Sequence, residues 1–274
     1  MALDRRALLT AFAATALAPS LVEAQVTTND FDLPLADGRV VRVISRNVPN
    51  PRGVVLFSHG GGSWPEQYHK MGAFLLKQGF AVLAPLHTDS VKIPEDKRAT
   101  LQSSFPQRIA DMAAVAAYAK SAYKDLPQIS AGHSYGSLFA AMLGGALDYV
   151  APLYAPDVKA VVCFSSPGAI PSLINPTSYA TLKAPLLMET GDADTVPGFV
   201  TDWHDHLLPF EGTTVKESYA LIIKGGGHEL ISGADPVRFA LALDVTRQFL
   251  GREILGSDGT ISLPTGAAAE LRQK

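Results

Sequence analysis

Residues 128–137, QISAGHSYGS, place a serine between two glycines directly after a short apolar run. The apolar residues 129–131 predict a strand, and the helical spacing of residues 135–147 predicts a helix immediately afterwards. A strand that turns at once into a helix around Gly-x-Ser-x-Gly matches the nucleophile elbow, in which the flanking glycines let a strained turn present the serine hydroxyl. The sequence therefore predicts that Ser134 is a nucleophile. The alternative is an ordinary turn, because glycine and serine are common in turns.

The rest of the chain alternates short apolar runs with helical patterns, as a parallel sheet with helices on both faces does. The predicted strands are residues 40–44, 54–57, 80–84, 129–131, 160–164, 185–189 and 219–223. The predicted helices are residues 69–78, 106–120, 135–147 and 236–250, the last with Asp235 as N-cap and Gly251 past its end. The predicted fold class is α/β, in one domain spanning residues 25–251. The polar residues 252–274 form a C-terminal tail that we expect to lie loosely on the surface.

A serine hydroxyl needs a base and an orienting carboxylate. Among the seven histidines, His228 follows the last predicted strand in the flexible loop KGGGHE and can reach over the serine. Asp194 follows the preceding strand in GDADTVP and is the predicted acid, with Asp192 in reserve or bracing the loop as an Asx turn. The other histidines favour structural roles: His59 in a turn, His133 facing away from the serine, and His69, His204 and His206 in helical patterns.

Two further loops belong to the predicted site. Residues 58–63, SHGGGS, follow a central strand, and the backbone N–H of Gly61 can pair with that of Tyr135 as an oxyanion hole. A phosphate-binding loop is the weaker alternative, since neither glycine spacing typical of nucleotide sites occurs. His87 and Asp89 follow another strand and are possible substrate contacts, although loop hydrogen bonds are the favoured interpretation. We expect no metal site, because two histidines spaced as His204 and His206 point to different sides of a helix.

The ordered combination of HGG, GHSYG, GDADTVP and GGH resembles the α/β-hydrolase superfamily over about residues 31–251. The chain is similar to compact secreted serine esterases of the dienelactone-hydrolase-like or platelet-activating-factor-acetylhydrolase-like kind. Dienelactone hydrolases proper use a cysteine where this chain has Ser134, so their activity does not carry over. The resemblance implies an α/β-hydrolase fold and a serine, aspartate, histidine triad in that chain order. It implies hydrolysis of a carboxylic ester through an acyl-enzyme, without a cofactor.

Composition limits the classes of partner. Hydrophobic residues make up 47% of the chain, charged residues 18%, and the net charge is −3, which argues against a nucleic-acid partner and favours a small-molecule ester. The single Cys163 lies in an apolar run, so a buried strand residue is expected. The loop after that strand is short for a cap domain. A small lid or none is therefore predicted, and with it a preference for short acyl groups.

Residues 1–24 resemble a twin-arginine export signal, with Arg5-Arg6, an alanine-rich apolar run and a small-residue site before Gln25. Asp4 and Thr10 depart from the usual pattern. An N-terminal helix or membrane anchor is the alternative, but the run falls short of the roughly 20 residues that span a bilayer. We expect cleavage near residue 24, a periplasmic or secreted mature protein, and no membrane span within it. The oligomeric state is not predicted.

The same triad could serve an acyltransferase, a perhydrolase or an amidase. A non-catalytic binding protein of the same fold is a further alternative. The presence of all three triad residue types in order favours the enzyme.

Overall fold

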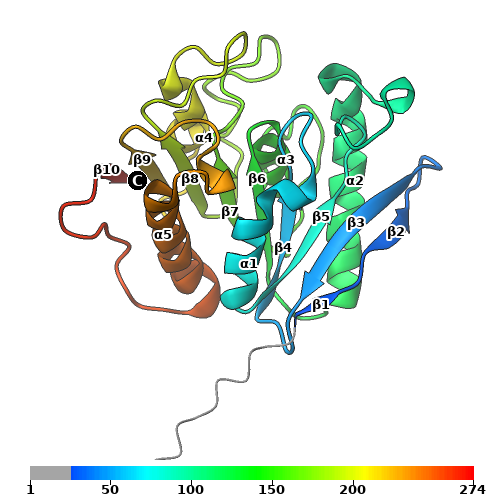
Figure 1. Cartoon of the computed structure of the whole chain (residues 1–274), viewed down its shortest axis with the longest axis horizontal. Helices are drawn as coiled ribbons and strands as arrows, with labels where there is room; N and C mark the ends of the chain where they lie inside the picture. The colour runs from blue at the N-terminus through cyan, green and yellow to red at the C-terminus, as the bar shows by residue number, and fades with distance from the viewer. Residues whose placement is uncertain (1–25) are drawn as a thin grey trace, which may run out of the picture.

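The apolar runs of the sequence form the central strands of one sheet, as the computed structural model of the protein shows (Figure 1). The structure describes residues 26–274, so the predicted export signal lies outside the described residues. Within them the sheet has ten strands in the order β1-β3-β5-β4-β6-β7-β8-β9-β10, with β2 paired to β3. The strands from β5 to β9 are parallel, while β1, β2, β3 and β10 pair antiparallel at the two edges.

The strands are β1 (Thr27–Thr28), β2 (Phe31–Pro34), β3 (Val40–Asn47), β4 (Gly53–Ser58), β5 (Phe80–Pro85), β6 (Gln128–His133), β7 (Val158–Phe164), β8 (Leu186–Gly191), β9 (Tyr219–Ile223) and β10 (Ala269–Gln273). The helices are α1 (His69–Lys77), α2 (Leu101–Ala122), α3 (Tyr135–Leu143), α4 (Leu208–Gly212) and α5 (Pro236–Leu255). Every residue of β4, β5, β6, β8 and β9 is buried, as expected of strands covered on both faces.

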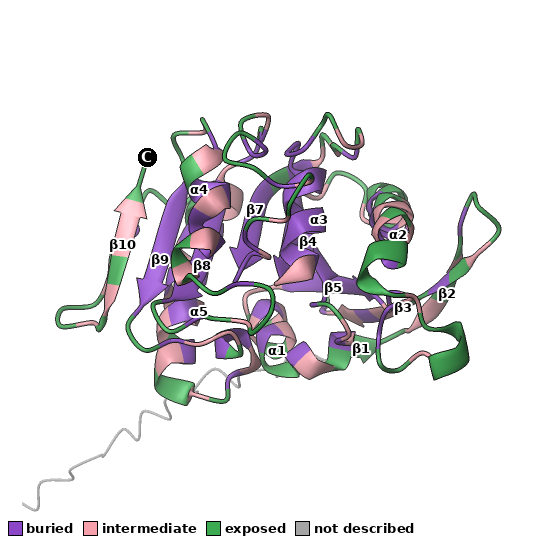
Figure 2. Ribbon diagram, turned by 90° about the horizontal axis from the view of Figure 1, so that it is seen from above, coloured by how far each residue is buried: buried purple, intermediate pink, exposed green. Residues whose placement is uncertain are grey.

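Helices cover both faces of the sheet (Figure 2). On one face α1 and α5 pack over a core that includes Met71 and Phe249. On the other face α2 and α3 pack over a core that includes Met112 and Leu138. Cys163 is buried in β7, where desolvation raises the pKa of its thiol, so its structural interpretation is confirmed. The predicted α/β architecture is confirmed.

Three helix boundaries differ from the sequence prediction. Helix α2 starts at Leu101 and not at Pro106, because Thr100 and Ser103 form a reciprocal capping box that closes the first turn. Helix α3 ends at Leu143, before two glycines. Helix α5 begins as predicted, with the Asp235 carboxylate accepting from the amides of residues 237 and 238, but continues through Gly251 and ends at Gly256 in a left-handed conformation (φ 69°).

The C-terminal tail is not loose, which corrects the expectation for residues 252–274. Strand β10 pairs antiparallel with β9 in continuous register from Ala269↔Ile223 to Gln273↔Tyr219. The pairing supplies acceptors and donors to an edge of β9 that would otherwise be open. The sheet therefore extends to residue 273. Among residues 26–274, no helix has the length and apolarity needed to cross a bilayer.

The topology brings the predicted site residues to one edge of the sheet. Five parallel strands carry them: β4 is followed by the glycine loop, β6 by Ser134, β8 by Asp194 and β9 by His228, while β5 leads to the loop of His87. Parallel strands place their carboxyl ends at the same edge, where ligands of open α/β sheets bind. This edge is where the site must be sought.

Candidate active site

Ser134 occupies a strained turn between β6 and α3. Its φ is 51° and its ψ −125°, values that non-glycine residues rarely adopt. The two glycines permit this turn by removing side chains from its tightest contacts. A Cβ on Gly132 would lie 2.4 Å from the carbonyl oxygen of Gly136, and one on Gly136 would lie 2.0 Å from that of Ser58. The turn therefore has the backbone of a nucleophile elbow.

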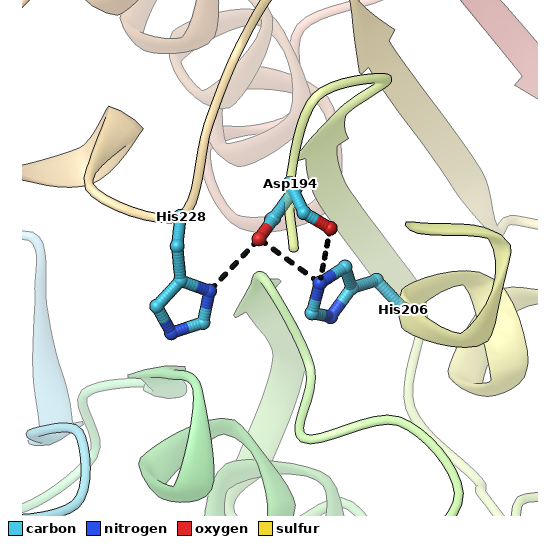
Figure 3. Close-up of side chains that lie close together, drawn as sticks. All are labelled: Asp194, His206 and His228. Carbon is cyan, nitrogen blue, oxygen red and sulfur yellow. Dashed lines mark hydrogen bonds and ion pairs between the residues drawn. The ribbon is translucent and has the colours of Figure 1, made fainter. Parts of the chain in front are cut away.

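Asp194 and His228 meet because their strands are neighbours. The loop after β8 is fastened to the loop after β9 by the hydrogen bond from the Ala193 amide to the Gly226 carbonyl, 3.1 Å long. Gly191 allows this approach, since a Cβ there would lie 2.2 Å from the Gly226 oxygen. His228 Nδ1 then lies 2.8 Å from Asp194 Oδ1 (Figure 3).

The structure separates the two acidic candidates. Asp194 is fully buried and faces His228, whereas Asp192 is exposed and accepts a 2.5 Å hydrogen bond from the Gly225 amide, bracing the loop. Burial alone would raise the pKa of Asp194, but hydrogen bonds and charge from His206 and His228 outweigh it and hold the pKa below its usual range. Asp194 is thus an ionised acceptor for the histidine.

The hydrogen bond to Asp194 fixes the tautomer of His228. Because an ionised carboxylate only accepts, Nδ1 carries the proton and Nε2 is left with its lone pair, directed away from Asp194. His228 and Ser134 both line a cavity of about 790 Å³ at the carboxyl edge of the sheet. The Ser134 hydroxyl has no hydrogen-bond partner within residues 26–274, so it is not used to cap its own helix. Both groups are thus available to a substrate.

The two predicted oxyanion donors face the same cavity. Tyr135 is the first residue of α3 and lines the cavity, and the Ser134 side chain does not cap that helix, so the Tyr135 amide has no acceptor within residues 26–274. In the glycine loop, Gly60 N–H donates to Tyr68 Oη and Gly62 N–H to Asp89 Oδ2, both at 3.0 Å. The Gly61 amide has no acceptor among the described residues. Its position and that of Tyr135 fit a pair of donors for an oxyanion.

Buried Arg108 orients the glycine loop from below. It forms a two-pronged ion pair with Asp89, with Nε–Oδ1 and Nη2–Oδ2 distances of 2.8 Å. It also donates to the carbonyl oxygens of His59 (2.7 Å) and Gly60 (3.0 Å). Since the C=O and N–H of one peptide point in opposite directions, the bond to the Gly60 oxygen turns the Gly61 N–H away from Arg108. Although burial favours the neutral acid, Arg108 lowers the pKa of Asp89 to about 2.

His87 and Asp89 lie outside the cavity that Ser134 lines, contrary to their prediction as possible substrate contacts. Neither lines the cavity, and both are buried. His87 bridges Ser58 Oγ (3.0 Å) and Asp111 Oδ2 (2.9 Å), while Asp89 is engaged by Arg108 and the glycine loop. The physical reason is that the loop after β5 folds beneath the glycine loop, where its polar groups satisfy one another. The favoured alternative, loop hydrogen bonds, describes them.

His133 links the glycine loop to the His228 loop. Its Nδ1 lies 3.0 Å from Tyr68 Oη and its Nε2 2.9 Å from the carbonyl oxygen of His228. Tyr68 Oη in turn accepts from the Gly60 amide. Burial, with His228 nearby, lowers the pKa of His133 to about 3, so the ring is neutral and can accept at Nδ1 while donating at Nε2. The side chain therefore holds the two loops together.

His206 is the residue that the sequence interpretation missed. It lies in the 3-10 helix Trp203–Leu207 and is fully buried, with Nε2 2.9 Å from Asp194 Oδ1. His204 is exposed and pairs with Asp202, so the two histidines do point to different sides. The helical spacing could not predict the contact of His206 with Asp194, because that contact depends on the path of the loop between the two residues.

Asp194, His206 and His228 are the group of described residues whose ligand atoms approach closely enough to suggest a metal. Both imidazole nitrogens, however, lie within 2.9 Å of the same carboxylate oxygen. Two ligands of one tetrahedral zinc ion lie about 3.3 Å apart, from bond lengths near 2.0–2.1 Å. The separations are those of hydrogen bonds. The cluster is therefore a hydrogen-bonded network.

The walls of the cavity are mostly apolar. The apolar lining comes from the loop after β7, the segment after Asp194 and the start of α2, and includes Pro167, Ile170, Leu173, Val196, Phe199 and Phe105. Glu229 is the one side-chain carboxylate among the described lining residues, and no lysine or arginine is among them. Such a lining suits a neutral, largely apolar substrate.

The family model of the S33 serine aminopeptidases matches residues 49–190, just over half of the chain. The chain belongs to this family of α/β hydrolases. The matched segment of this S33 family member contains the glycine loop, Arg108 and Ser134. No protein of curated function matches the sequence.

Solved structures share the fold of this S33 family member. The esterase domain of a Rhodothermus marinus protein is 15% identical with a TM-score of 0.60, covering 84% of this chain and 99% of that one. A Pyrococcus furiosus esterase is 17% identical with a TM-score of 0.61, covering 83% and 92%. A Thermus thermophilus protein is 18% identical with a TM-score of 0.58, covering 84% and 100%. At these identities the likeness establishes the fold.

The close packing of the elbow predicts that alanine in place of glycine destabilises the protein at the elbow but not in an open helix. Gly136→Ala places a methyl group 2.0 Å from the Ser58 oxygen and should destabilise the protein by about 3 kcal/mol. Gly72→Ala is the matched control, because Gly72 lies inside α1 with no atom within 4 Å of a new Cβ, and should stabilise by about 0.5–1 kcal/mol. Urea unfolding measures both. Equal effects would contradict the close packing of the elbow.

The buried Arg108–Asp89 ion pair predicts that the stability of the protein falls strongly when one partner is removed alone. Arg108→Met leaves the Asp89 carboxylate buried without a counter-charge and should cost about 3–5 kcal/mol. Adding Asp89→Leu should recover part of that loss. Arg247→Met, which removes an exposed pair with Asp244, should cost less than about 1 kcal/mol. Unfolding midpoints in urea test the set, and a double variant no more stable than Arg108→Met would contradict the pairing.

Proposed function

We propose that this protein is a serine esterase that cleaves a small, neutral carboxylic ester through an acyl-enzyme. The observation that carries the proposal is the Asp194–His228 hydrogen bond of 2.8 Å, directed into a cavity that Ser134 also lines. Membership of a serine hydrolase family and the esterase structures of the same fold support it. No cofactor is required for this chemistry.

In the proposed reaction, Ser134 Oγ attacks the ester carbonyl carbon as His228 Nε2 takes the hydroxyl proton. The carbonyl oxygen becomes an oxyanion between the N–H groups of Gly61 and Tyr135. The proton then passes from His228 to the leaving alcohol as its C–O bond breaks. Water, deprotonated by the same imidazole, hydrolyses the acyl-serine. Ionised Asp194 orients His228 throughout and balances its charge.

Hydrolysis of an amide is the second candidate, since the matched family model is described as that of a serine aminopeptidase. The same triad can release an amine or an alcohol, so the site chemistry permits both. The apolar lining favours the ester. Comparing a p-nitrophenyl ester with the anilide of the same acid separates the two.

The proposed triad predicts a large loss of kcat for three substitutions and a small change for a fourth. Ser134→Ala, His228→Ala and Asp194→Asn should each lower kcat by at least about 10³-fold, because each removes part of one proton-transfer unit. Asp192→Asn should change kcat less than about threefold, since this exposed carboxylate braces a loop. Hydrolysis of p-nitrophenyl butyrate and labelling by a fluorophosphonate measure the effects. Labelling that persists in Ser134→Ala would contradict the assigned nucleophile.

The open cavity predicts a preference for short acyl chains. Residues 165–185, between β7 and β8, form turns without a helix, so no cap domain closes over the site. A long chain would leave much of its apolar surface in water and gain little binding energy from it. In a series of aryl esters from acetate to palmitate, kcat/KM should peak at or below butyrate. Faster turnover of palmitate than of butyrate would contradict this.

The narrower likeness to dienelactone hydrolases and platelet-activating-factor acetylhydrolases stays a prediction from sequence motifs. Export to the periplasm or medium is also our proposal, supported by the Arg5-Arg6 pattern and apolar run of residues 1–24.

A further inference from the structure

A second histidine approaches the triad aspartate from the side opposite His228 (Figure 3). His206 Nε2 lies 2.9 Å from Asp194 Oδ1 and 3.1 Å from the Asp194 carbonyl oxygen. His206 Nδ1 is hydrogen-bonded to the carbonyl oxygen of Ser166, in the loop after β7. The side chain is fully buried, so no other partner competes for either nitrogen.

The partners of His206 determine its protonation. A carbonyl oxygen and a carboxylate oxygen accept hydrogen bonds and cannot donate them. A neutral imidazole carries one N–H and one lone pair, so one nitrogen would face an acceptor without a proton between them. Only the doubly protonated ring satisfies both contacts.

We propose that His206 is held as an imidazolium that neutralises Asp194, and that it acts as a positioning residue for His228. The proposal rests on the proposed function, in which His228 is the base. It assigns to the active site a fourth side chain, which does not touch substrate and acts through the carboxylate.

The contacts of Asp194 show how the two histidines share it. Oδ2 accepts from Ser165 Oγ (2.5 Å) and Thr190 Oγ1 (2.8 Å), and Oδ1 accepts from His228 Nδ1 (2.8 Å). His206 Nε2 forms an ion pair with the same Oδ1 at 2.9 Å. Three hydrogen bonds and this ion pair thus engage both carboxylate oxygens. The carboxylate cannot rotate without breaking several bonds. His206 thereby fixes the oxygen to which His228 must point.

The electrostatics agree with this assignment. Burial lowers the pKa of His206, but the hydrogen bond and charge of Asp194 outweigh it and leave the pKa raised. The imidazole rings of His206 and His228 are stacked with centroids 5.8 Å apart. A cation so close to a second imidazole disfavours another positive charge beside it.

The titratable groups around this pair come from several loops. Asp194 faces both rings, and neutral His133 lies against His228 with ring centroids 4.7 Å apart. Glu229 follows His228 at the exposed rim, and Asp205 precedes His206. The exposed Asp192 binds the Gly225 amide and is directed away from the rings. Among these groups only His206 can supply the buried positive charge.

Two readouts test the proposal on the full chain. In long-range ¹H–¹⁵N spectra of protein labelled at histidine nitrogens, one histidine should have both ring nitrogens protonated at pH 7, and its signals should vanish in His206→Gln. The glutamine can donate to Asp194 but carries no charge. The midpoint of the acid limb of kcat/KM should then move to higher pH by about 1, because the neighbouring cation is gone. His204→Gln, two residues away and exposed, should change neither readout.

The outcomes are separable. A neutral His206 at pH 7 would overturn the proposal, and so would a fall in kcat/KM by the same factor at every pH in His206→Gln, which indicates a merely structural role. If that variant does not fold, Asp194→Asn provides the second arm, since loss of the carboxylate charge should leave His206 neutral at pH 7. A chain without ester turnover would overturn the proposed function, while the nitrogen spectra would still decide the charge on His206.

Discussion

The backbone at Ser134 is the constraint on which the site depends. Its positive φ is tolerated because Gly132 and Gly136 remove the two side chains that would collide with neighbouring backbone. That single turn ends β6, starts α3 and sets both the serine hydroxyl and the first free amide of the helix against one cavity. Strain of this kind costs about 1–3 kcal/mol and persists only where the surroundings enforce it. Here the buried strands and the carbonyl of Ser58, packed on Gly136, enforce it.

The glycine loop needs a different support, because glycines have no side chains to pack. Arg108 supplies it by binding the successive carbonyl oxygens of His59 and Gly60, while its partner Asp89 binds the Gly62 amide. A buried ion pair contributes little net stability compared with apolar residues of similar size, since both charges lose their water. The ion pair instead orients the loop, since hydrogen bonds from the planar guanidinium fix which way the peptide groups of residues 59–61 face. The conformation of the loop is thereby set before substrate binds.

The sequence was enough to predict strands β3 to β9, the elbow and the order of Ser134, Asp194 and His228, because each depends on local patterns: an apolar run, a glycine turn, a loop at a strand end. It could not predict Arg108 or His206. Arg108 interrupts an alanine-rich helix and looks like an exposed residue until the loops after β4 and β5 close over it. His206 reaches Asp194 only through the path of residues 195–202, which no periodicity specifies. Strand β10 was missed for a related reason, since its residues, AELRQ, are poor strand formers and pair because β9 offers a free edge.

Two buried pairs of opposite charge bracket the cavity: Arg108 with Asp89 beneath the glycine loop, and His206 with Asp194 behind the histidine loop. With His206 as the imidazolium we propose, each pair is neutral as a unit, so neither projects a net charge onto the bound substrate. The field in the cavity then comes from the oriented amides of Gly61 and Tyr135, which favour the negative charge that develops on a carbonyl oxygen during attack. Glu229 at the rim opposes anionic groups, and the apolar walls bind neutral ones. These features are why we propose a neutral ester, which becomes charged only at its reacting carbonyl, as the substrate: its transition state differs in charge from its ground state where the amides lie.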